Sequence, residues 1–259
     1  MSVYDEGQGS VIVMVHPGLS DGRRCRKIAS QMSSDYRVLR LTRAQYRPDR
    51  GVPVSVEREV EDVLALIRSV GEPVVVYGHS SGGVVALEAL VASPSSFAGA
   101  VIFEPAAVIG PPLSGQGGEI LQRARAALEA GKPGKALAIF LRDTLRMPGG
   151  QARLAGAVTA LIPRYRRLIP RQLDDLEALD RLGLRLDAYA TIEVPTVLLG
   201  GERSPAHLAE RLDALQRVMP RAERVVLPGC DHGADLRKPA EVARVIRSLA
   251  EKVLPTDGA

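Results

Sequence analysis

The sequence contains no tryptophan, and aromatic residues make up only 3% of its 259 positions. Proteins that hold single-stranded nucleic acid stack its bases on aromatic side chains beside a basic groove. Here the formal charge is +4, but the lysines and arginines do not form one continuous run. We therefore expect no nucleic-acid partner.

Long apolar runs and clustered cysteines are also missing. No stretch reaches the roughly 18 uninterrupted apolar residues of a membrane helix, so membrane insertion is not expected. The polar N-terminal segment MSVYDEGQGS shows no secretory-signal pattern, which favours a cytoplasmic location. Cys25 and Cys230 lack metal-ligand spacing and are predicted to be free thiols, and we expect no metal and no organic cofactor.

The sequence does contain an alternation of short apolar runs with segments of helical period. Apolar strands joined by helical crossovers indicate an α/β fold, with a mostly parallel sheet covered by helices on both faces. The predicted strands are 11–15, 37–41, 73–78, 99–104, 194–200 and 223–229. The predicted helices are 26–32, 56–70, 84–92, 206–219 and 239–253.

The alternation stops over residues 106–190. Apolar residues there recur at intervals of three and four in 119–130, 135–146 and 171–182, as in amphipathic helices, and Pro163 and Pro170 are expected to break the segment. It carries 13 Lys and Arg against 8 Asp and Glu, a net of +5 that exceeds the charge of the whole chain. We predict a core of residues 1–105 and 191–259 with a helical insertion between them.

The run VVVYGHSSGG places Ser80 between an apolar strand and a helix. Gly78 to Gly82 fits GxSxG, the sharp strand-to-helix turn that exposes a serine hydroxyl. The pattern alone is weak, but this context makes it specific. A helix-capping serine is the alternative.

A serine nucleophile needs a base, and the chain has four histidines. His232 follows the predicted strand 223–229, so it lies beyond a carboxyl end of the sheet, where α/β proteins bind ligands. We expect the His79 side chain to point away from the attack side of the serine. His207 is expected to face solvent, and His16 to be structural.

These motifs resemble those of α/β-hydrolase-fold proteins with a helical cap. The elbow GHSSG, the early strand end VHPG and the late loop LPGCDHG stand in the order of that family and span residues 11 to 250. The resemblance implies that His232 is the general base and that residues 106–190 are the cap. It also implies extra N-terminal antiparallel strands, for which this chain has little room, so a shortened sheet edge is expected.

The third catalytic group departs from the family pattern. Where the family has an aspartate, in a stretch resembling GxxDP, this chain has Ser204 in GERSP. A hydroxyl does not stabilise an imidazolium as a carboxylate does. Glu104, at a strand end that carries the acid in some members, is the preferred candidate, and Glu202 is the alternative.

The resemblance also implies two backbone donors for a substrate oxyanion. One is the N–H of Ser81, after the nucleophile, and the other is the N–H of Gly18 in His16-Pro17-Gly18. Pro17 replaces the usual glycine of this motif, which bears on the detailed geometry of the loop.

The sequence thus predicts a serine hydrolase for a small acyl substrate, an ester, thioester or lactone. An acyltransferase, cyclase or thioesterase of a biosynthetic pathway and a ligand-binding protein without turnover are the alternatives. The basic residues of the expected cap have two interpretations. They attract an anionic or carrier-linked substrate, or they form a solvated helix face: Arg123, Arg142, Arg164, Arg166 and Arg167. Four apolar cap residues either line the pocket or pack on the sheet: Leu137, Ile139, Phe140 and Leu145.

Overall fold

One sheet of seven strands organises the protein, seen in a computed structural model that describes residues 2–47, 49 and 53–255. The strand order is β1-β3-β2-β4-β5-β6-β7, and all neighbours are parallel except β1 and β3. The strands are β1 (Ser2–Glu6), β2 (Val11–Val15), β3 (Arg37–Thr42), β4 (Val74–His79), β5 (Phe97–Phe103), β6 (Thr196–Gly201) and β7 (Ala222–Leu227). The predicted mostly parallel sheet is confirmed, with a single five-residue antiparallel strand at its N-terminal edge.

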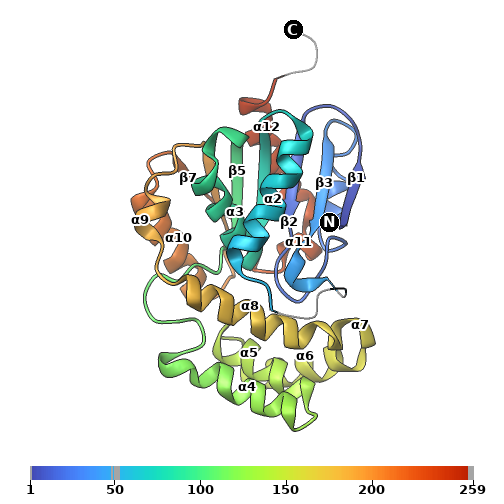
Figure 1. Ribbon diagram of the computed structural model, residues 1–259, viewed down its shortest axis with the longest axis vertical. Helices are drawn as coiled ribbons and strands as arrows, with labels where there is room; N and C mark the ends of the chain where they lie inside the picture. Colours follow the sequence, from blue (N-terminus) through green and yellow to red (C-terminus); the bar gives the residue numbers. More distant parts are fainter. Residues whose placement is uncertain (1, 48, 50–52, 256–259) are drawn as a thin grey trace.

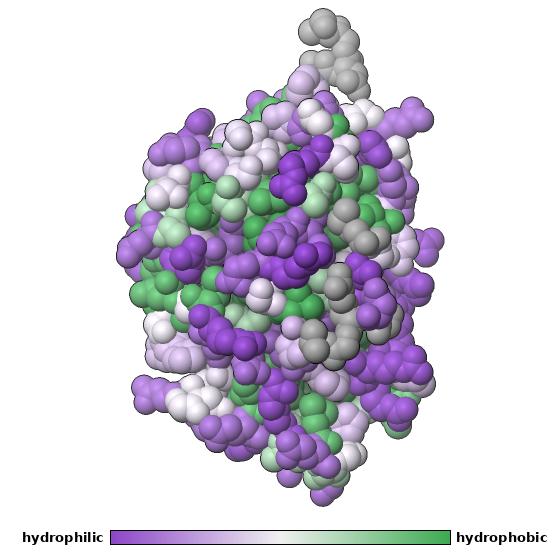
Figure 2. Space-filling model, viewed as in Figure 1, coloured by the Kyte–Doolittle hydropathy of each residue, from purple (hydrophilic) through white to green (hydrophobic). Residues whose placement is uncertain are grey.

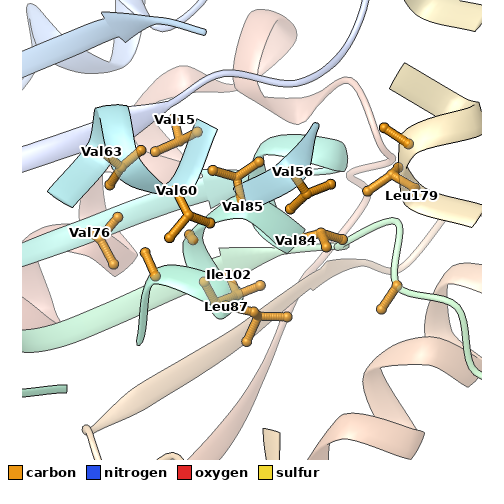
Figure 3. Close-up of a cluster of buried hydrophobic side chains, with 14 of the residues drawn as sticks. Val15, Val56, Val60, Val63, Val76, Val84, Val85, Leu87, Ile102 and Leu179 are labelled. Carbon is orange, nitrogen blue, oxygen red and sulfur yellow. The ribbon is translucent and has the colours of Figure 1, made fainter. Parts of the chain in front are cut away.

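Helices cover both faces of the sheet because successive residues of its strands point to opposite sides. In β2, Val11, Val13 and Val15 join one core cluster, whereas Ile12 and Met14 join the other. The first cluster packs under α2 (Val56–Val70), α3 (Ser81–Ala92) and α10 (Ala206–Val218), and Figure 3 shows part of it. The second packs under α1 (Arg26–Ala29), α11 (Ala234–Arg237) and α12 (Pro239–Val253).

Six helices lie between β5 and β6, in the segment predicted to be an insertion, and Figure 1 shows α4 to α8 gathered at one end of the sheet. They are α4 (Glu119–Glu129), α5 (Pro133–Asp143), α6 (Gly149–Leu161), α7 (Pro163–Arg166), α8 (Leu168–Leu182) and α9 (Leu186–Tyr189). The expected break at Pro170 is wrong, because this residue lies in the first turn of α8, where a proline costs no helical hydrogen bond. Short 3₁₀ turns are η1 (Ala44–Tyr46), η2 (Pro94–Ser96) and η3 (Gln116–Gly118).

Hydrophilic side chains are spread over the whole face drawn in Figure 2, with small apolar areas between them. Within the described part of the chain, no helix is both long and apolar enough to cross a membrane.

Candidate active site

Ser80 lies on a strained turn between β4 and α3. Its φ of 55° and ψ of −123° fall outside the regions that residues with a Cβ ordinarily adopt. The turn is held because the Ser80 N–H donates to the Phe103 carbonyl at 3.0 Å. Gly82 allows the close packing of this turn on β2, since a Cβ there would stand 2.3 Å from the His16 carbonyl oxygen.

His232 and Glu104 meet at the carboxyl ends of the central strands. His232 Nδ1 lies 2.7 Å from Glu104 Oε2, and Glu104 Oε1 accepts from the Gly201 N–H at 2.8 Å. Burial alone would raise the pKa of Glu104, but the hydrogen bond and charge of His232 and the Gly201 N–H lower it. A carboxylate only accepts, so Nδ1 carries the proton and Nε2 is left as an acceptor.

The two candidate acids have different partners. Glu104 is 1% exposed, has a φ of 40° and contacts His232, whereas Glu202 accepts from the Gly229 N–H at 2.6 Å at an exposed position. The Ser204 hydroxyl lies near enough to Glu104 to help lower the pKa of that carboxyl, but it makes no hydrogen bond of good geometry within the described residues. The carboxylate beside His232 therefore comes from the end of β5.

His79 is packed behind His232. Its ring stacks on Phe103 and meets the His232 ring edge-on, with centroids 4.5 Å and 4.7 Å away. His79 Nδ1 is 3.5 Å from Asp235, whose carboxylate accepts two hydrogen bonds from Arg24. Although its Nδ1 faces Asp235, His79 still forms part of the wall around Ser80.

His16 is fully buried and orients the loop that follows β2. The Arg43 N–H donates to His16 Nε2 at 3.1 Å, so the proton is on Nδ1, which lies 2.8 Å from the Pro17 carbonyl. Burial and the charge of Arg43 lower the pKa of His16 to about 3. A neutral His16 in one tautomer fixes the Pro17-Gly18 turn.

The expectation that His207 faces solvent is wrong. Its side chain is 3% exposed, and neither ring nitrogen has a hydrogen-bond partner within the residues that the structure describes. It lies in the first turn of α10, next to the buried Leu208 in the chain, and residues 109–113 line the same hollow.

The backbone N–H groups of Gly18 and Ser81 are candidate oxyanion donors. Neither donates to an acceptor in the described part of the chain, and both residues line the cavity that contains Ser80. Gln172 of α8 closes over this loop, since a Cβ on Gly18 would stand 2.1 Å from its Oε1.

A buried arginine that the sequence analysis missed connects this loop region to the insertion. Arg43 donates to Ser81 Oγ at 2.6 Å, to Glu59 of α2 and to Asp175 of α8, and Tyr46 also donates to Asp175. The sequence offered only a weak signal for Arg43, a charged residue directly after the predicted strand region, because that strand, RVLRLT, itself contains two arginines.

A cavity of about 300 Å³ joins these groups. Ser80 and His232 lie in its wall, and much of the rest is apolar, including Leu113, Phe140, Leu145 and Leu208. Phe140 and Leu145 thus line the pocket, whereas Leu137 and Ile139 pack in the core.

The five arginines of residues 106–190 that were singled out in the sequence do not line this cavity. Arg123 and Arg142 pair with Asp143, Arg164 pairs with Asp21, and Arg166 and Arg167 are exposed. The arginines that do line it are Arg24, from the loop before α1, and Arg211, from α10.

Both cysteines are buried and unpaired. Across the described residues, no group of three or more His, Cys, Asp or Glu side chains is arranged to hold a metal ion.

The family follows from a match to residues 12–245, nearly the whole chain, by the model of the alpha/beta hydrolase family. The chain belongs to the alpha/beta hydrolase family. No curated protein matches it.

Solved structures share this fold at low sequence identity. An alpha/beta hydrolase from Sphaerobacter thermophilus is 24% identical, with a TM-score of 0.75 over 96% of this chain and 95% of its own. A thermophilic esterase from Thermogutta terrifontis is 20% identical, with a TM-score of 0.75 over 98% and 94%. Est816, described as an N-acyl homoserine lactone degrading enzyme, is 20% identical, with a TM-score of 0.73 over 95% of each chain.

Proposed function

We propose that the protein is a serine hydrolase that cleaves carboxylic esters, thioesters or lactones through an acyl-enzyme. The observation that carries this proposal is the Glu104–His232 hydrogen bond of 2.7 Å, at the wall of the cavity that also exposes Ser80. The fold resemblance to an esterase and to a lactone-degrading enzyme agrees with it.

In this mechanism Ser80 Oγ attacks the substrate carbonyl carbon while His232 Nε2 takes its proton. The N–H groups of Gly18 and Ser81 bind the developing oxyanion, and Glu104 stabilises the imidazolium. His232 then protonates the leaving group. Water, activated by His232, hydrolyses the acyl-enzyme and restores Ser80.

Two features support preorganisation of these groups. Among the described non-glycine residues, positive φ angles occur at Leu19, Ser80, Glu104 and Arg146, and the first three form or support the proposed site. Arg43 also holds the Ser81 side chain, so the peptide that would supply one oxyanion donor is anchored. Strain that is concentrated at one site is typical of catalytic geometry.

Hydrolysis of p-nitrophenyl butyrate by four forms of the enzyme tests the assignment. Ser80→Ala is expected to abolish turnover, and Glu104→Gln to lower kcat roughly 10⁴-fold, the scale seen when a triad acid is made neutral. Glu202→Gln is the matched control and should stay close to wild type, because the Glu202 carboxylate accepts its hydrogen bond from the Gly229 N–H at an exposed position. Full activity in Glu104→Gln would overturn the proposed acid.

A further inference from the structure

Arg211 is a cation without a carboxylate partner in the wall of the proposed catalytic cavity. It is partly buried, and in the described residues it makes no hydrogen bond or ion pair. Arg24, the other arginine of this wall, is neutralised by two hydrogen bonds to Asp235, at 2.5 Å and 2.9 Å. Burial and the charge of Arg146 lower the pKa of Arg211 to about 10, as expected for a guanidinium that lacks an anion.

Arg211 also borders a second cavity of about 370 Å³, which adjoins the first through Leu113 and Thr144. Arg146 and the buried His207 line this second cavity, and Arg146 is held at a φ of 55°. His207 offers two ring nitrogens with no partner in the described chain, so an N–H is available to a ligand. Three nitrogen-bearing side chains thus line the second cavity, and one of them, Arg211, also lines the first.

Two carboxylates line the second cavity, and neither neutralises this cluster. Asp143 is paired with Arg142 and Arg123, while Glu210 is exposed and forms no ion pair with Arg211 within the described residues. The charge of Glu210 acts only at a distance, to raise the pKa of Arg211. Arg211 and Arg146 therefore keep an excess of positive charge beside the cavity that contains Ser80.

We propose that Arg211, with Arg146 and His207, binds an anionic oxygen group of the substrate, a carboxylate or a phosphate. The proposal rests on the function proposed above and narrows its substrate class to an ester with an apolar segment between the scissile carbonyl and an anionic end. Leu145, Phe140 and Leu208 form the apolar wall for that segment. A guanidinium suits either anion, because its planar donors match two oxygens at once.

Two esters of the same chain length test this subsite: p-nitrophenyl hexanoate and mono-p-nitrophenyl adipate, which ends in a carboxylate. Wild type should prefer the adipate ester by kcat/KM. Arg211→Gln should lower the adipate-to-hexanoate ratio roughly 10- to 100-fold, the loss of one charge-assisted contact. Arg146→Gln should lower it less, and Arg211→Lys should retain part of it.

Arg217→Gln is the matched control, because Arg217 is an exposed arginine on the same helix. The adipate-to-hexanoate ratio of kcat/KM for Arg217→Gln should equal that of wild type. An Arg211→Gln ratio equal to wild type, or a wild type without preference for the adipate ester, overturns the subsite. If Arg211→Gln fails to fold, Arg146→Gln decides by the same ratio, since Arg146 is exposed. A p-nitrophenyl ester ending in a phosphonate separates the two anions: a higher kcat/KM than the adipate ester assigns phosphate.

Binding of free adipate tests the anion subsite independently of the proposed hydrolase activity. If wild type hydrolyses neither ester, the hydrolase assignment fails, and calorimetry with adipate then decides the subsite alone. Adipate binding by wild type that is lost in Arg211→Gln supports the subsite. No binding to wild type contradicts it.

Discussion

Three of the four histidines are buried groups whose environment opposes a positive charge. Burial is the main cause that lowers the pKa of His16 to about 3 and of His207 to about 4, and it lowers that of His79 as well. In the unfolded chain each imidazole returns to its ordinary value near 6.5. Below that pH the unfolded chain therefore binds protons that the folded protein does not.

This difference predicts how stability depends on pH. The free energy of unfolding should be greatest above about pH 6.5 and should fall as the pH drops. Near pH 5 its slope should correspond to the uptake of about two to three protons on unfolding. Urea unfolding between pH 5 and pH 7 measures it. His207→Gln should reduce this proton uptake on unfolding by about one proton. A free energy of unfolding that stays constant or rises from pH 7 to pH 5 contradicts the burial of these neutral rings.

At the scale of elements, one buried ion cluster joins α8 of the insertion to α2, η1 and the start of α3. Arg43 contributes the cation, and Glu59 and Asp175 the carboxylates, all at most 2% exposed. Burial alone would lower the pKa of Arg43, but the two carboxylates raise it. Because Gln172 and Asp175 belong to one helix, the cluster also fixes the helix that closes over Gly18.

The two sides of this cluster should respond unequally to substitution. Arg43→Met leaves two buried carboxylates without a cation and is expected to lower the free energy of unfolding by about 3–5 kcal/mol. Asp175→Asn leaves the Arg43–Glu59 pair and should cost less. Urea unfolding at pH 7 measures both, with the exposed Arg217→Gln as the control. A larger loss for Asp175→Asn than for Arg43→Met would contradict this charge assignment.

At the scale of the whole molecule, the sheet could be predicted because buried parallel strands are short apolar runs. The runs 11–15, 37–41 and 73–78 each fall within one residue of a strand at either end. The edge strand β1 could not be predicted from its sequence, because SVYDE has only two apolar residues. It forms a strand by pairing with β3.

The site was partly predictable for the same reason. Ser80, His232 and Glu104 each follow a strand, so sequence order alone brings them to one edge of the sheet. The choice between Glu104 and Glu202 needed coordinates, because both stand at that edge. The Arg43–Asp175 pair, 132 residues apart, and the burial of His207 depend on how the insertion packs, for which no local pattern exists.

The most direct test of the central claim, that Ser80 is an activated nucleophile, is the intact mass of the protein after treatment with a fluorophosphonate. Attack by Ser80 Oγ on phosphorus expels fluoride and leaves one phosphonyl group on the chain. Wild type should gain one such group, and Ser80→Ala should gain none. An unmodified, folded wild type, or an equal adduct on Ser80→Ala, would contradict the proposed mechanism.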